Sequence, residues 1–137
     1  MNRKYLEDII PKHEIFGCYD ETCSRHERWD KQVEKYGFCD IETWDLDRTF
    51  AQIIYERLMM YLECADGKVD LSLRTIEVLD TELTLKDAIE FTIWECKKAI
   101  KATTSAIQTT DPERYAYIEA MDIVWQMMSK MHKHLWW

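Results

Sequence analysis

Glycine and proline are scarce in this chain, with three and two copies among 137 residues. A turn-rich β-sandwich needs many more of both, so their scarcity favours long helices. Long apolar runs are also missing, and the first residues, MNRKYLEDII, lack the hydrophobic stretch of a secretory signal. We therefore expect a cytoplasmic protein that does not cross a membrane.

Basic charge is also in short supply, since 26 acidic residues stand against 18 basic ones and give a net charge of -8. Generic binding of a phosphate backbone needs a basic surface, so we expect no generic nucleic-acid binding. The sequence has no glycine-rich phosphate loop and no supported Ser/His/Asp or Cys/His arrangement. We therefore expect a protein without catalytic residues or a cofactor, and not an enzyme.

Hydrophobic residues make up 47% of the chain and aromatic residues 12%. A single domain of this length can bury about two-thirds of its unfolded surface. Residues 1–36 are expected to form a short helical N-terminal appendage, because Ser24 and Glu27 have the spacing of a capping box and Gly37 would end that helix. Residues 37–137 are expected to form the helical bundle.

Three long amphipathic helices are expected in that bundle, each with a capping signal at its start. They run over about 44–65, 84–100 and 111–135. The segment 68–82 alternates in places, as a strand does, but a lone strand has no partner, so we interpret it as an irregular connection or a short helix. The predicted fold class is all-α, a compact bundle of three long helices with a short helical appendage.

Several charged residues fall on the apolar stripes of these helices, among them Asp47, Arg57 and Asp122. A charge buried in a stripe must be paired or must line a cavity. One reading is a buried ion pair between helices, for example Arg57 with Asp122. The other reading is a polar pocket in or between bundles.

Aromatic residues are plentiful, with six tryptophans and seven tyrosines. Trp44, Trp94 and Trp125 lie near the stripes and are expected in the core, whereas Trp29 is harder to bury. Aromatic rings next to cations often hold ligands or partner side chains. The candidate ligand-binding residues are Asp47, Arg57, Trp94, Lys97, Arg114, Tyr115 and Asp122.

The C-terminal aromatic residues offer a second candidate surface, made of Tyr117, Trp136 and Trp137. They exceed what one domain of this size needs for packing, so we expect a homo-oligomer, most simply a two-fold dimer. The alternative is that the C-terminal tail docks on its own bundle.

Metal chemistry has only loose sequence support. The five cysteines are scattered and odd in number, and we interpret them as free thiols. A zinc site is a weak alternative, and its possible ligands are His13, Cys18, Cys23, His26 and Cys39. A magnesium-dependent pyrophosphohydrolase would need paired carboxylates on two helices, for which the pairs are Glu119 with Asp122 and Glu77 with Asp80. A solvated acidic face is the simpler interpretation, and we expect no metal.

One segment resembles a known group of proteins. The order Gly-aromatic-x-Asp-x-x-Thr-Trp-x-Leu-Asp is formed by Gly37, Phe38, Asp40, Thr43, Trp44, Leu46 and Asp47. This order ahead of a helix, with the ending Leu135-Trp136-Trp137, resembles a family of small helical proteins of tailed phages and prophages. The resemblance covers roughly residues 36–137. It implies a phage origin and brings no known activity with it.

These observations together lead us to expect a phage-encoded, non-enzymatic binding protein that inhibits a bacterial defence system in the host cytoplasm. It would sequester a small signal nucleotide or occupy a host defence protein. An accessory protein of virion structure or assembly is the alternative, and the magnesium-dependent pyrophosphohydrolase is the third.

Overall fold

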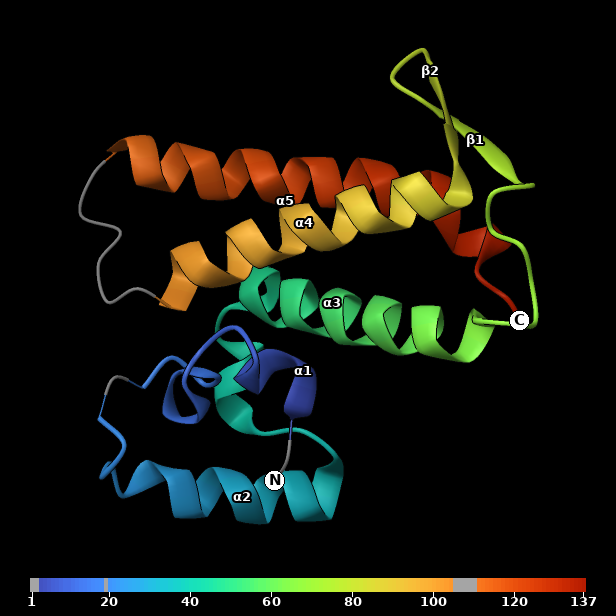
Figure 1. The fold of residues 1–137 in the computed structure, drawn as a ribbon. Coiled ribbons are helices and arrows are strands. Elements are labelled where there is room, and N and C mark those ends of the chain that lie inside the picture. The colour runs from blue at the N-terminus through green and yellow to red at the C-terminus, as the bar shows by residue number, and fades with distance from the viewer. Residues whose placement is uncertain (1–2, 19, 105–110) are drawn as a thin grey trace.

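The computed structural model describes residues 3–18, 20–104 and 111–137, and it is mostly helical, at 66%. Figure 1 shows the order of the elements. The α-helices are α1 (Lys4–Glu7), α2 (Arg25–Tyr36), α3 (Leu46–Ala65), α4 (Leu85–Thr104) and α5 (Asp111–Met131). The strands are β1 (Thr75–Val78) and β2 (Thr81–Thr84), and the 3-10 turns are η1 (Lys12–Glu14), η2 (Asp40–Thr43) and η3 (His132–His134).

The predicted helical class is therefore confirmed, but the predicted architecture is wrong in two respects. The described part of the chain has five α-helices rather than three long ones, and its small two-stranded sheet makes the fold not purely all-α. None of the described helices is long and apolar enough to cross a membrane.

The sheet is an antiparallel hairpin in the segment that we expected to be irregular. Thr75 lies opposite Thr84 and Val78 opposite Thr81, so β1 does have a partner. That partner, β2, directly precedes α4. The two turn residues, Leu79 and Asp80, have φ angles of 52° and 60°, the left-handed values that a two-residue hairpin turn requires.

The three longest helices form the main body, in which α4 lies between α3 and α5 and packs against both (Figure 1). The face of α4 that carries Ile89, Thr92 and Cys96 is fully buried. The Thr84 hydroxyl accepts the Asp87 N–H at 3.1 Å and caps α4, as predicted. Helix α3 is capped by Asp45, whose side chain accepts the Arg48 N–H.

The N-terminal segment packs on the side of α3 that faces away from α5 (Figure 1). Two buried polar side chains of α3 reach into it and satisfy backbone carbonyls there. The Gln52 amide donates to the Ile15 carbonyl at 2.9 Å, and the Arg48 guanidinium donates to the Phe16 carbonyl at 3.3 Å. These bonds fix the segment after η1 against α3, because an unpaired buried amide or guanidinium is costly.

The tryptophans are distributed differently from the prediction. Trp44 is 82% exposed, Trp94 is 61% exposed and Trp125 is 43% exposed, so none of them is in the core. Trp44 precedes the first residue of α3, so the helical stripe does not extend to it, and Trp94 lies on the outward side of α4. Trp29, which we expected to be hard to bury, is 1% exposed.

Candidate functional site

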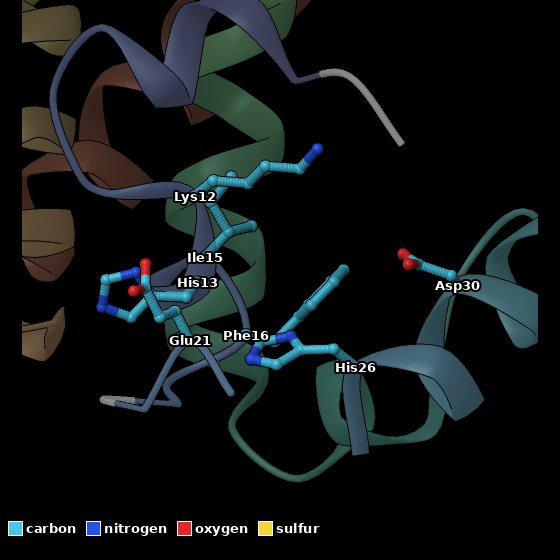
Figure 2. Close-up of a pocket in the computed structure, with 7 residues that line it drawn as sticks. All are labelled: Lys12, His13, Ile15, Phe16, Glu21, His26 and Asp30. Atoms are coloured by element: carbon cyan, nitrogen blue, oxygen red, sulfur yellow. The ribbon is translucent and has the colours of Figure 1, made fainter. Parts of the chain in front are cut away.

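The N-terminal segment contains a pocket with a volume of about 280 Å³, which Figure 2 shows. Its lining combines basic, acidic and imidazole side chains with an apolar floor. The lining residues are Lys12, His13, Ile15, Phe16, Glu21, His26 and Asp30.

Two short elements and the loop between them bring these side chains together. Lys12 and His13 come from η1, while His26 and Asp30 lie one turn apart on α2. In Figure 2 the Lys12 amine and the Asp30 carboxylate approach from opposite sides. The pocket therefore offers charges of both signs around an aromatic ring.

A buried tryptophan supports the floor of the pocket. The Trp29 ring lies 5.5 Å from the Phe16 ring and 5.2 Å from the His26 ring, which it meets edge-on. The Trp29 indole N–H donates to the Asp40 carboxylate at 3.1 Å. Since Trp29 contacts both lining rings and its N–H is hydrogen-bonded, the two lining rings have a rigid support.

The loop that carries Glu21 is fixed by its own hydrogen bonds. The Asp20 carboxylate accepts from the hydroxyl and the N–H of Thr22, at 2.6 and 2.9 Å. These bonds, the side-chain one first, hold the pKa of Asp20 below its usual range. The Asp20 carbonyl also lies 3.3 Å from the His26 ring nitrogen, which ties the loop to α2.

The ligand residues proposed from the sequence do not meet in one place. Arg57 forms an ion pair with Glu56 at 3.4 Å, in a groove of α3, so the suggested Arg57–Asp122 pair is wrong. Trp94 lies on the outside of α4, and the Lys97 amine is 6.0 Å from the centroid of the Tyr55 ring. Tyr115 is exposed on α5, and the side chain of Arg114 lies outside the described residues.

Asp47 and Asp122 flank a second feature, which we call the aromatic face: Leu46 and Phe50 of α3 with Ile118 and Trp125 of α5. All four side chains are exposed. The Phe50 and Trp125 rings lie 5.5 Å apart at an angle of 73° and join the two helices. Asp47 and Asp122 each lie one turn before one of these rings and are exposed.

The three candidate interface residues lie in two different environments. Tyr117 is partly buried against the core, whereas Trp136 and Trp137 are exposed. The Tyr117 hydroxyl is buried without a hydrogen-bond partner, and burial, then Asp45 and Asp47, raise its pKa. The Arg74 guanidinium carbon lies 3.5 Å from the centroid of the Trp136 ring, and the Lys68 amine lies 3.9 Å from the centroid of the Trp137 ring. The tail therefore docks on its own chain, while both tryptophans keep more than half of their surface exposed.

A buried charge on α4 was missed by the sequence analysis. Glu95 is 3% exposed, and one of its oxygens accepts from the Lys98 amine at 2.9 Å. Its other oxygen has no hydrogen-bond partner. The stripe rule that singled out Asp47 could have found it, because Glu95 follows Thr92 by three residues on the buried side of α4.

No set of three or more metal-binding side chains gathers anywhere in the residues that the structure describes. The weak zinc alternative is therefore not assembled there. The carboxylates of the magnesium alternative lie apart in the chain, with Glu77 on β1, Asp80 in its turn, and Glu119 and Asp122 exposed on α5.

No family model, curated protein or solved structure matches this chain. The functional argument therefore depends on the pocket and the aromatic face. Sequence reasoning considered His13 and His26 only as loose zinc ligands, and it did not connect them with Lys12 or Asp30. The i, i+4 spacing of His26 and Asp30 was the available signal.

Proposed function

We propose that this protein is a phage-encoded, non-enzymatic binding protein that inhibits a bacterial defence system by occupying a defence protein in the host cytoplasm. The phage origin rests on the resemblance of the Gly37–Asp47 segment and the C-terminal Leu135–Trp137 to the phage family. The aromatic face supports the mode of action.

The observation that carries the proposal is the exposed contact between Phe50 and Trp125. These two rings join α3 to α5 and remain open to solvent. Leu46, one turn before Phe50 on α3, and Ile118, two turns before Trp125 on α5, are also exposed. Trp44, the most exposed tryptophan, lies two residues before the start of α3. Contiguous exposed apolar side chains mark binding surfaces, and exposed tryptophans often supply most of the binding energy there.

The charge around the aromatic face indicates the chemistry of the partner. Asp47 and Asp122 flank the two rings, and the whole chain carries a net charge of -8. Complementary potentials steer association and exclude wrong partners. We therefore expect the defence protein to present an apolar depression with a basic rim.

Plating assays on bacteria that carry single defence systems test this proposal. Expression of the protein is expected to restore plaques of a sensitive phage on at least one defended strain. Trp125→Ser and Phe50→Ser should abolish the rescue, while Phe91→Ser, at an exposed phenylalanine of α4, should retain it. Rescue on no strain, or full rescue by both aromatic-face variants, would overturn the proposal.

Capture of a small signal nucleotide is a second candidate, favoured by the pocket of Figure 2. Lys12 can pair with a phosphate, Asp30 can accept hydrogen bonds from a base edge, and the buried Phe16 ring presents an apolar edge to the pocket. Isothermal titration with linear and cyclic nucleotides tests it. Lys12→Gln and Asp30→Asn should weaken binding while Trp125→Ser leaves it unchanged.

Two other outcomes would replace the proposal. Presence of the protein in purified virions, with loss of progeny on undefended hosts after gene deletion, would indicate a virion accessory role. Magnesium-dependent release of pyrophosphate that is lost in Glu119→Gln would indicate an enzyme.

A further inference from the structure

Two cysteine side chains lie together between Phe16 and the start of α2, and the proposed function uses neither of them. The Cys18 thiol donates to the Asp20 carbonyl at 3.3 Å, and the same carbonyl accepts the Cys23 backbone N–H at 3.1 Å. The Arg25 guanidinium donates to the Cys23 sulfur through its Nε at 3.2 Å. The arrangement is a pair of thiols with a cation at its side.

The two members of the pair differ in their access to solvent. Cys23 is partly exposed, just ahead of α2, and Cys18 is buried behind it. The hydrogen bond from Arg25 lowers the pKa of Cys23, and the contact with the Cys18 thiol lowers it further. An accessible sulfur with thiolate character is the nucleophilic form of cysteine.

Other thiols of the same chain provide an internal contrast. Cys39 and Cys96 are both buried, and each has a pKa raised to about 12. Burial is the largest cause in each case, and a nearby carboxylate is the second, Glu42 at Cys39 and Glu95 at Cys96. These two thiols are therefore expected to be inert under conditions in which Cys23 reacts.

We propose that Cys23 and Cys18 form a peroxide-reactive dithiol in which Cys23 is the nucleophile and Cys18 resolves the product into a disulfide. The inference depends on two observations: the Asp20 carbonyl is bonded by both Cys18 and Cys23, and Arg25 donates to the Cys23 sulfur. It goes beyond the proposed binding function.

The chemistry needs hydrogen peroxide as the oxidant and proceeds in two steps. The Cys23 thiolate attacks one peroxide oxygen, the O–O bond breaks, and the departing hydroxide takes up a proton to become water. Cys23 is then a sulfenic acid, oxidised by the two electrons that reduce the peroxide. The Cys18 sulfur next attacks the Cys23 sulfur, the S–O bond breaks, and the oxygen leaves as water with the Cys18 proton. Two thiols and one peroxide thus give one disulfide and two waters.

The disulfide would change the wall of the pocket. The Asp20 carbonyl accepts from the Cys18 thiol and lies against the His26 ring nitrogen, and its neighbour Glu21 lines the pocket. Oxidation removes the thiol proton that Cys18 donates, so the carbonyl loses one of its three contacts, the others being the Cys23 N–H and the His26 ring nitrogen. We expect the loop at Glu21 to shift against α2, and ligands of the pocket to respond to the redox state.

Peptide mapping of the full-length reduced protein tests the inference cleanly, because trypsin separates the thiols. Both cysteines of the pair fall in the peptide 13–25, whereas Cys39, Cys64 and Cys96 fall in three other peptides. After brief exposure to peroxide and alkylation, the peptide 13–25 should carry no alkyl group and should be lighter by two hydrogens than its reduced form. The other three thiols should be alkylated, and dithiothreitol should reverse the change.

Variants separate the two roles. Cys18→Ser should leave Cys23 as a sulfenic acid that dimedone traps, while Cys23→Ser should leave Cys18 reduced. Arg25→Ala should slow alkylation of Cys23 by about tenfold, since it removes the cation that favours the thiolate. Arg28→Ala is the matched control on the same helix, because Arg28 pairs with Asp40 and not with the thiols. The rate of alkylation of Cys23 should be unchanged in Arg28→Ala.

The inference is wrong if the peptide 13–25 is oxidised no faster than the peptide of Cys64, or if Cys23→Ser leaves Cys18 equally reactive. A disulfide that joins Cys23 to Cys39 or Cys64 would also overturn it. None of these results depends on whether a defence protein or a nucleotide binds.

Discussion

At the residue scale, Trp29 and Trp44 show that a hydrophobic side chain is buried by its surroundings and not by its spacing alone. Trp29 is enclosed by Phe16 and His26, and its N–H reaches Asp40. Trp44 precedes α3 and points to solvent. Sequence reasoning assigned them in reverse because two of the Trp29 partners, Phe16 and Asp40, come from the chain before and after α2, and no local pattern brings them together.

Replacing each of these tryptophans by alanine should separate stability from binding. Trp29→Ala removes a fully buried ring and a hydrogen bond, so it should lower the free energy of unfolding by about 3–5 kcal/mol. Trp44→Ala should change it by less than about 0.5 kcal/mol, because the ring is already in water. Urea unfolding measures both values. A large loss in Trp44→Ala alone would contradict the structure.

Asp40 gives the stability a specific dependence on pH. Hydrogen bonds from Gln32, then the charge of Arg28 and the Trp29 N–H, hold the pKa of Asp40 below its usual value. Because the pKa of Asp40 is lower in the folded state, its carboxylate stabilises the fold in full above the unfolded pKa of about 3.9. That stabilisation is lost as the pH falls through the pKa of Asp40 in the folded state. Asp40→Asn should therefore be less stable than the wild type near pH 6. The difference in melting temperature between the wild type and Asp40→Asn should become smaller below about pH 4. If the difference were the same at every pH, the Asp40 carboxylate would not be the source of the pH dependence.

At the element scale, local signals located most helix ends but not the hairpin. Thr84 caps α4, Gly37 ends α2 in a left-handed conformation, and α5 begins at Asp111, all as expected. These features depend on a few neighbouring residues. The hairpin turn at Leu79 and Asp80 lacks the Asn-Gly signature, and its strand pairing depends on contacts with α5 and α4 that the sequence does not display.

The turn of the hairpin should be open to improvement. Both turn residues have positive φ, which is costly for leucine in particular. The double change Leu79→Asn and Asp80→Gly should raise the free energy of unfolding by about 1–2 kcal/mol, since asparagine and glycine tolerate this conformation. Leu73→Asn is the matched control, an exposed leucine outside the turn, and should bring no gain. Thermal unfolding of the wild type, the double variant and the Leu73→Asn control measures these differences in stability.

At the scale of the whole molecule, the C-terminal tail ties distant parts of the chain together. The Tyr61 hydroxyl of α3 donates to the Trp136 carbonyl at 3.0 Å, and the Arg74 guanidinium donates to the His134 carbonyl at 2.9 Å. These contacts join residues that are 75 and 60 positions apart in the sequence, so no local pattern predicts them.

Removal of one of these tail contacts should be measurable. Tyr61→Phe keeps the ring and deletes the hydrogen bond to the Trp136 carbonyl, so the free energy of unfolding should fall by about 1 kcal/mol. Tyr115→Phe, at an exposed tyrosine of α5, should leave it unchanged. Equal stability of both variants would mean that the tail detaches in solution.

Formation of a two-fold dimer remains a prediction. Trp136 and Trp137 keep half or more of their surface open while they contact Arg74 and Lys68. Light scattering at micromolar concentration should report twice the chain mass, and the double variant Trp136→Ala, Trp137→Ala should report a single chain. A wild-type monomer would exclude the dimer.

The uneven burial of the six tryptophans has an optical consequence. Trp29 is the one with almost no exposed surface, while the other five range from 43% to 82% exposed. Most of the intrinsic emission therefore originates from indoles already in contact with water, and unfolding should shift its wavelength only slightly. A partner that covers Trp44 and Trp125 should shift the emission to the blue. The protein thus carries its own spectroscopic probe for association, and a poor one for denaturation.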